Sequence, residues 1–75
     1  MKRAYKVNTY RDKYVLAKFQ NKTGGFHSEV SRNPNGGYFV MEYVGNISFP
    51  AIPPKWKKFK IKNNAIMEAK RYVRS

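Results

Sequence analysis

Two clusters of turn-forming residues divide the chain into short segments and constrain its fold more than any other feature. The first runs from Asn21 to Gly25, and the second is Asn33-Pro34-Asn35-Gly36-Gly37. Glycine tolerates positive φ, proline fixes φ, and asparagine bonds to its own backbone, so such clusters favour turns. Residues 26–31, between the clusters, alternate with a period of two, which predicts a strand.

The segment from Tyr38 to Val44 is the most strand-like part of the sequence. One face carries Phe39, Met41 and Tyr43, and the other also has mostly apolar side chains. Strands that are apolar on both faces are typical of a sheet interior. We therefore predict that this segment is a central strand.

The N-terminal part predicts a hairpin. Tyr5, Val7 and Thr9 alternate with polar residues, and residues 14–20 form a β-rich run after a possible turn at 11–13. Alternation of this kind suits a half-buried strand.

A helix over residues 10–22 is the competing interpretation of the same region. Thr9 and Asp12 have the spacing of a capping box, and Val15, Leu16 and Phe19 share a helical face. We favour the hairpin.

The region after residue 44 predicts a turn, a short strand and a loop. Gly45-Asn46 fits a type II′ turn, and residues 47–49 are long enough to fold back as a short strand. Pro50, Pro53 and Pro54 follow, and because proline lacks a backbone N–H we expect irregular structure there.

The C-terminal segment predicts a helix. Asn63 or Asn64 is suited to cap it, and an apolar stripe follows, formed by Ala65, Ile66, Ala69, Tyr72 and Val73. The predicted fold is α+β: a small antiparallel sheet of four to five short strands with one C-terminal helix packed on one face. With 75 residues, we expect a single basic domain spanning positions 1–75.

The charge of the chain is strongly positive and unevenly distributed. The formal net charge is +12, composed of +6 in residues 1–22, −1 in residues 23–54 and +7 in residues 55–75. So large an excess predicts a polyanionic partner. We expect the two basic ends to converge on one face and to bind nucleic acid, DNA rather than RNA, with weak sequence preference.

A second function class fits the same charge. A small inhibitor or adaptor, of the kind encoded by phages and mobile elements, would dock a basic face on an acidic or nucleic-acid-binding surface of another protein. A structural or ribosome-associated role is a third possibility. The sequence alone does not separate these classes.

The segment from Pro53 to Lys62 is the strongest candidate binding element. As a regular strand it would place Lys58, Lys60 and Lys62 on one face at about 6.6–6.8 Å spacing, with Phe59 and Ile61 in the core. Such a row suits phosphates, although lysines on an edge strand also prevent edge-to-edge aggregation.

Trp56 has the same parity as these lysines. It would therefore face solvent on a regular strand and could stack on a base or sugar. A lone tryptophan in a small protein more often fills the core. We favour the core position for this residue.

The candidate nucleic-acid-binding residues come from both basic ends of the chain. They are Lys55, Trp56, Lys57, Lys58, Lys60, Lys62, Lys70, Arg71, Arg74, Lys2, Arg3, Lys6 and Lys13.

The sequence carries no signature of catalysis, metal binding or a cofactor. It has no cysteine and one histidine, His27, and its four acidic residues are dispersed. We expect a protein that is not an enzyme and needs no cofactor. No apolar run reaches the roughly 20 residues of a membrane span, and the lack of cysteine fits a cytoplasmic protein, with no role for the membrane.

The last forty residues resemble a known kind of DNA-binding module. Tyr- and Val-rich strands, the basic run Phe59-Lys60-Ile61-Lys62 and a helix carrying Glu68-Ala69-Lys70 look like the modules at the start of tyrosine recombinases. The proline-rich insertion and the longer gap between Phe59 and Glu68 depart from that pattern. The resemblance is one of architecture, and it implies a sheet that enters the major groove with a helix packed behind it.

Overall fold

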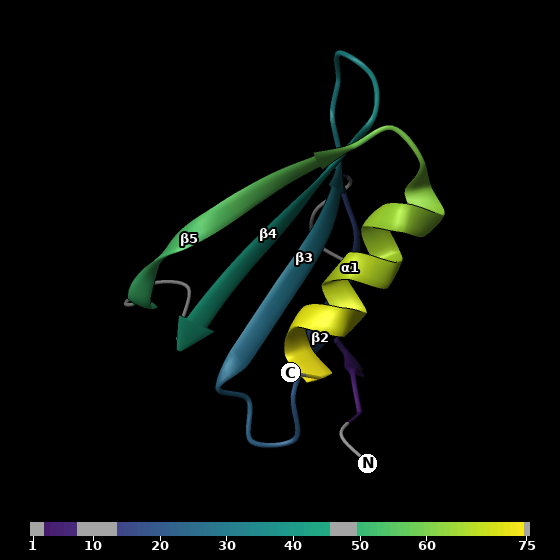
Figure 1. Ribbon diagram of the computed structural model, residues 1–75. Helices are drawn as coiled ribbons and strands as arrows, with labels where there is room; N and C mark the ends of the chain where they lie inside the picture. The colour runs from purple at the N-terminus through teal and green to yellow at the C-terminus, as the bar shows by residue number, and fades with distance from the viewer. Residues whose placement is uncertain (1–2, 8–13, 46–49, 75) are drawn as a thin grey trace.

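The fold is an antiparallel meander with one helix packed on it (Figure 1). A computed structural model describes residues 3–7, 14–45 and 50–74. Each strand pairs with the next one in the chain, which confirms the predicted α+β fold class. The elements are β1 (Tyr5–Val7), β2 (Val15–Gln20), β3 (Phe26–Arg32), β4 (Tyr38–Gly45), β5 (Pro50–Phe59) and α1 (Lys62–Arg74).

The hairpin prediction for the N-terminal part is confirmed where the structure describes it. β1 pairs antiparallel with β2, with Tyr5 opposite Gln20 and Val7 opposite Lys18. β2 also pairs with β3 along its other edge, so its backbone groups are satisfied without a helix. The predicted turn at residues 11–13 lies outside the described residues.

The second turn cluster joins β3 to β4. Asn33 N–H donates to the Gly37 carbonyl at 3.0 Å, and Gly36 N–H donates to the Asn33 carbonyl at 2.9 Å. Gly37 has a φ of +83°, and a Cβ there would lie 2.8 Å from the carbonyl oxygen of Phe59. Only glycine fits this close approach, so the turn is fixed against the end of β5. β4 lies between β3 and β5, as predicted for a central strand.

The prediction of a loop at the prolines is wrong. β5 begins at Pro50 and continues through Pro53 and Pro54. Because β5 is the last strand of the sheet, proline residues cost no ladder hydrogen bond where the backbone faces outward. Shifts in the β4–β5 register near Glu42, Val44 and Gly45 also take up the irregularity. The predicted short strand at 47–49 and the Asn46 part of the turn lie outside the described residues, whereas Gly45 has the expected positive φ.

The boundary between β5 and α1 differs from the prediction. The strand ends at Phe59, and Ile61 is 58% exposed rather than buried in the core. Ala65 N–H donates to the Ile61 carbonyl at 3.2 Å, so the helix begins there and not at an Asn63 or Asn64 cap. After β5 the chain turns away from the edge of the sheet and onto the face that α1 covers, and Ile61 lies in this turn.

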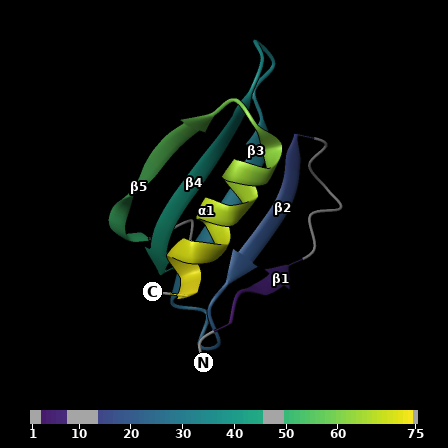
Figure 2. The ribbon, with the colours of Figure 1, turned by 45° about the vertical axis from the view of Figure 1, so that its right-hand side comes forward.

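The core lies between α1 and one face of the sheet (Figure 2). Helix α1 packs mainly on β3 and β4, and its small residues Ala65 and Ala69 allow a close approach. The Ser28 hydroxyl donates to the Ala69 carbonyl at 2.9 Å across this interface. The predicted apolar stripe of the helix is confirmed, and the buried core consists of Ala17, Phe19, Val30, Val40, Ala65, Ala69 and Val73.

The other side of the sheet, called the open face below, carries the alternate residues of each strand. Met41 and Tyr43 are buried there, 7% and 6% exposed, although they do not belong to the core under α1. His27 stacks on Tyr43 with 4.9 Å between ring centroids, which gives it a structural role. The open face is therefore partly apolar and aromatic.

Candidate nucleic-acid interface

Strand β5 sorts its basic and aromatic residues onto two sides. Lys57 pairs with Val40, whose side chain lies in the core, so Lys57 points to the helix side of the sheet. Trp56 and Lys58 pair with Met41 and Phe39 and share the open face. Lys60 follows the strand and Lys62 opens the helix, so the predicted row of three lysines on one strand face is wrong beyond Lys58.

Phe39, Trp56 and Lys58 form what is called here the aromatic–lysine cluster. The rings of Phe39 and Trp56 meet edge to face, with centroids 6.0 Å apart and planes at 89°. Lys58 Nζ lies 5.9 Å from the centroid of the Phe39 ring. Trp56 is 60% exposed, so the prediction that it fills the core is wrong. The face parity inferred from the sequence was right, and Trp56 is exposed because it lies on an edge strand, on the face that α1 does not cover.

On the helix side, Glu42, Lys57, Glu68 and Arg71 form a carboxylate network. Lys57 Nζ lies 2.7 Å from Glu68 Oε2 and 3.4 Å from Glu42 Oε1. Arg71 donates two hydrogen bonds to Glu68, at 2.7 and 2.8 Å. These contacts connect β4, β5 and α1, so two predicted binding residues, Lys57 and Arg71, already have acidic partners within the protein.

Glu42 is the buried member of this network. Its side chain is 2% exposed, and within the described part of the chain Oε2 has no hydrogen-bond partner. Burial, together with the nearby Glu68 carboxylate, raises the pKa of Glu42 to about 7, in spite of Lys57. The bonds from Arg71 chiefly hold the pKa of Glu68 far below its usual range. Glu68 is therefore the lasting negative charge of the pair, and Glu42 titrates near neutrality.

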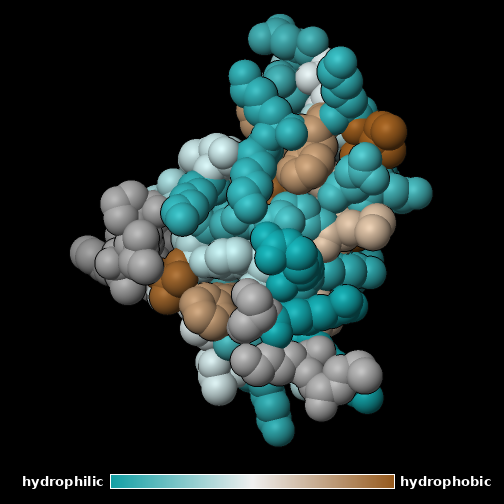
Figure 3. Space-filling model, viewed as in Figure 1, coloured by the Kyte–Doolittle hydropathy of each residue, from teal (hydrophilic) through white to brown (hydrophobic). Residues whose placement is uncertain are grey.

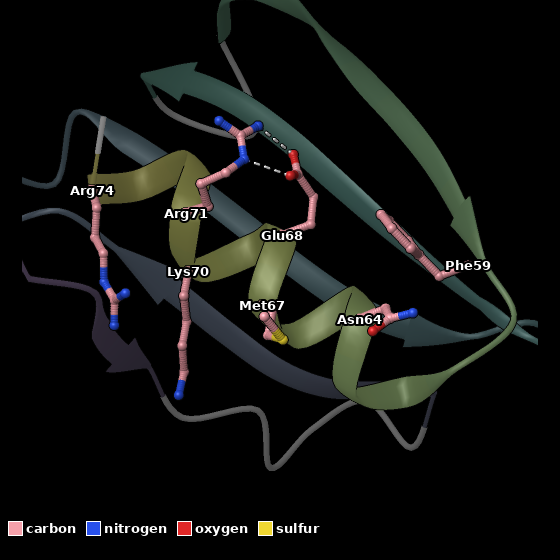
Figure 4. Close-up of a pocket in the computed structure, with 7 residues that line it drawn as sticks. All are labelled: Phe59, Asn64, Met67, Glu68, Lys70, Arg71 and Arg74. Carbon is pink, nitrogen blue, oxygen red and sulfur yellow. Dashed lines mark hydrogen bonds and ion pairs between the residues drawn. The ribbon is translucent and has the colours of Figure 1, made fainter.

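A second basic surface, the helix flank, consists of Lys6, Lys70 and Arg74. Figure 4 shows Lys70 and Arg74 on the opposite side of α1 from Glu68 and Arg71. Lys70 Nζ lies 5.7 Å from the centroid of the Phe19 ring, and Phe19 pairs with Lys6 in β1. The two basic ends of the chain therefore meet here.

The predicted convergence of all the basic residues on one face is not what the topology gives. β1 and β5 are the two edges of the sheet, so Lys6 lies across it from Lys55 and Lys58. Arg3 is exposed before β1, while Lys2 and Lys13 lie outside the described residues. The positive charge therefore forms two surfaces, one at β5 and one at the helix flank.

Few of the basic side chains are neutralised internally. Among residues 3–7, 14–45 and 50–74, ion pairs engage only Lys18, Lys57 and Arg71, and their partners are Glu29, Glu42 and Glu68. Hydrophilic side chains cover most of the face that Figure 3 shows over β5 and α1, with a few apolar ones between them. The described basic residues that make no ion pair are Arg3, Lys6, Lys22, Arg32, Lys55, Lys58, Lys60, Lys62, Lys70 and Arg74.

Two shallow hollows adjoin these charges. One lies along the exposed side of α1, where Phe59 and Met67 lie among the polar side chains drawn in Figure 4. The other lies between the turn at Asn33–Gly37 and the end of β5, and it is flanked by Lys58 and Lys60. Both are suited to an anionic ligand.

In the described part of the chain, no group of three or more His, Asp or Glu residues could hold a metal ion, and no helix is long and apolar enough to cross a membrane. No protein-family model matches the sequence, and no curated protein or solved structure shows significant similarity to it. The resemblance to recombinase modules therefore remains a prediction.

Sequence reasoning missed the carboxylate network. The signal that could have revealed it is Glu42, a charged residue in an otherwise apolar strand, since a buried carboxylate needs a cationic partner. The partner itself could not be identified, because eight lysine and arginine residues follow it in the C-terminal region.

Proposed function

We propose that this protein binds nucleic acid through its exposed basic side chains and with weak sequence preference. The observation that carries the proposal is the set of exposed lysines without acidic partners along β5 and the turn into α1: Lys55, Lys58, Lys60 and Lys62. The described acidic residues are already paired with other cations. The charge of these lysines is therefore available to an external anion.

A phosphate backbone suits this surface better than isolated small anions do. Four cations within eight residues would contact several phosphates at once and release their counterions. Lysines on an edge strand also discourage aggregation, and the two roles are compatible. No base-reading motif accompanies the lysines, so contacts to the backbone dominate the proposed binding.

The proposal is tested by measuring affinity for a DNA duplex and a single strand across a range of salt concentrations. We expect log K to fall linearly with log[salt], and the triple variant Lys58→Ala, Lys60→Ala, Lys62→Ala to lower the slope by up to about 3. Lys22→Ala removes one charge from the turn between β2 and β3. It is the control for the loss of a positive charge away from β5. Unchanged affinity and slope in the triple variant would restrict these lysines to edge protection.

An acidic protein partner is the alternative outcome. A pull-down from lysate treated with nuclease distinguishes the two, because nucleic-acid bridges are lost and a direct protein contact persists. Absence of nucleic-acid binding at low salt, together with a nuclease-resistant partner, would replace the proposed function by an inhibitor or adaptor role.

A further inference from the structure

The exposed indole of Trp56 is the feature that charge alone does not explain. Trp56 is the sole tryptophan of the chain and is 60% exposed, on a face where its neighbours Met41 and Tyr43 are buried. We propose that Trp56 stacks on an unpaired base of a single-stranded nucleic acid while Lys58 holds an adjacent phosphate. This inference rests on the proposed function and adds the class of ligand and the residue that receives its base.

The neighbours of Trp56 orient its ring. The Phe39 ring meets the indole edge to face at 89°, and Lys58 Nζ lies over Phe39. Edge-to-face packing fixes an aromatic ring while leaving one of its faces free. The cluster thus presents a positioned aromatic surface with a cation at its side, the combination that single-strand binding proteins use.

The spacing along β5 also suits a single strand. Trp56 and Lys58 are two residues apart on one face, a distance of about 6.6–6.8 Å. By a rough estimate from backbone reach, successive phosphates of an extended single strand are about 6–7 Å apart. Lys60, at the hollow beside the turn at Asn33–Gly37, continues the positive charge in the same direction. Because Lys58 and Lys60 line the same hollow, a strand with a base on Trp56 would bring its next phosphates toward both lysines.

The surroundings of Trp56 favour an unpaired base over a base in a duplex. In a duplex the faces of the bases are stacked on one another, so a projecting indole gains no contact with them. The cross-strand neighbours of the site, Phe39 and Met41, are apolar. Glu29, which lies opposite Met41 on the same face, is paired with Lys18, and Glu42 points to the helix side of the sheet.

Tryptophan fluorescence tests the inference directly, because every signal comes from Trp56. Oligothymidylate should quench the emission, and an abasic oligonucleotide of the same length should bind through its phosphates without quenching. Trp56→Ala should weaken binding of oligothymidylate by about 5- to 150-fold and leave binding of the abasic strand unchanged. Trp56→Phe should retain much of the affinity, because a ring face remains.

Tyr5→Ala is the matched control, since Tyr5 is a 39% exposed aromatic residue on β1, at the other edge of the sheet from β5. It should leave both affinities unchanged.

Equal affinity of the parent protein for the two oligonucleotides, without quenching, would overturn the stacking inference and leave the proposed function intact. Absence of binding to either at low salt would overturn both. Equal quenching by polyglutamate would indicate an acidic protein partner instead.

Discussion

Lys57 and Lys58 are neighbours in sequence and identical in chemistry, but the two sides of β5 give them different surroundings. Lys57 Nζ lies within 3.4 Å of two carboxylates, on the side covered by α1. Lys58 lies on the open face, where its described neighbour is the Phe39 ring. The alternation of a single strand therefore separates a cation that supports the fold from a cation available for binding.

This difference changes how the net charge should be counted. A formal charge of +12 treats every lysine and arginine alike. Two of the cations that the sequence places in the candidate site, Lys57 and Arg71, are committed to Glu42 and Glu68. On the helix side of β5, Lys57 is thus structural. The available charge is carried by Lys55, by Lys58 on the open face and by the lysines of the turn into α1.

Replacing Phe59 and Trp56 with alanine should give the largest difference in stability between the two sides of β5. Phe59 packs against the core on the helix side, so Phe59→Ala should cost roughly 2–4 kcal/mol of unfolding free energy, less than for a fully buried ring. Trp56→Ala loses chiefly the edge contact with Phe39, about 0.5–1.5 kcal/mol. Urea denaturation followed by circular dichroism measures both values.

Ile61→Ala is the control for this pair of substitutions. The sequence places Ile61 in the core with Phe59, but it is 58% exposed, so its replacement should change stability by no more than about 0.5 kcal/mol. A loss for Ile61→Ala as large as that for Phe59→Ala would contradict the division between strand and helix described above.

The carboxylate network should make stability depend on pH. Because the pKa of Glu42 is raised from 4.5 to about 7 in the folded protein, the folded state holds a proton that the unfolded state loses. Stability from this group is therefore greatest below about pH 4.5 and falls as pH rises to 7, by on the order of 1–3 kcal/mol. Glu42→Gln should remove this fall and be more stable than the parent at pH 8.

The low pKa of Glu68 acts in the opposite direction, because its ionised form is stabilised in the fold and that contribution is lost as pH falls. For this reason the measurement is the difference in unfolding free energy between Glu42→Gln and the parent at each pH. The effect of Glu68 largely cancels in this difference. A difference that stays constant from pH 5 to pH 8 would show that Glu42 does not titrate in this range.

The sequence predicted those parts of the fold that depend on local chemistry. The turn at Asn33–Gly37 needs glycine at positive φ, and the alternation in residues 26–31 and 38–44 assigns each side chain to a face. The apolar stripe of α1 was also visible, because it repeats with the helical period. These features require only neighbours along the chain.

The errors arose where the outcome depends on position within the whole sheet. Prolines in β5 are tolerated because it is an edge strand, and Trp56 is exposed because it lies on this edge strand, on the face that α1 does not cover. Neither the edge nor the covered face can be deduced from residues 50–62 alone. The candidate site was identified as a basic segment, but its division between Lys57 and Lys58 depends on the placement of Glu42 and Glu68 in space.

Single substitutions of Lys57 and Lys58 should change stability least. They test most directly whether one lysine supports the fold and the other binds nucleic acid. Lys57→Ala leaves the Glu42 and Glu68 carboxylates without a shared cation, which should cost up to about 1 kcal/mol, since the lysine itself is half exposed. Lys58→Ala should change stability by less than about 0.5 kcal/mol. Binding should show the reverse order: Lys58→Ala lowers the salt slope by about 1, and Lys57→Ala leaves it unchanged, because Lys57 is neutralised within the protein. Equal loss of slope in both variants would mean that nucleic acid competes with the carboxylates for Lys57, and that the helix side of β5 belongs to the binding surface as well.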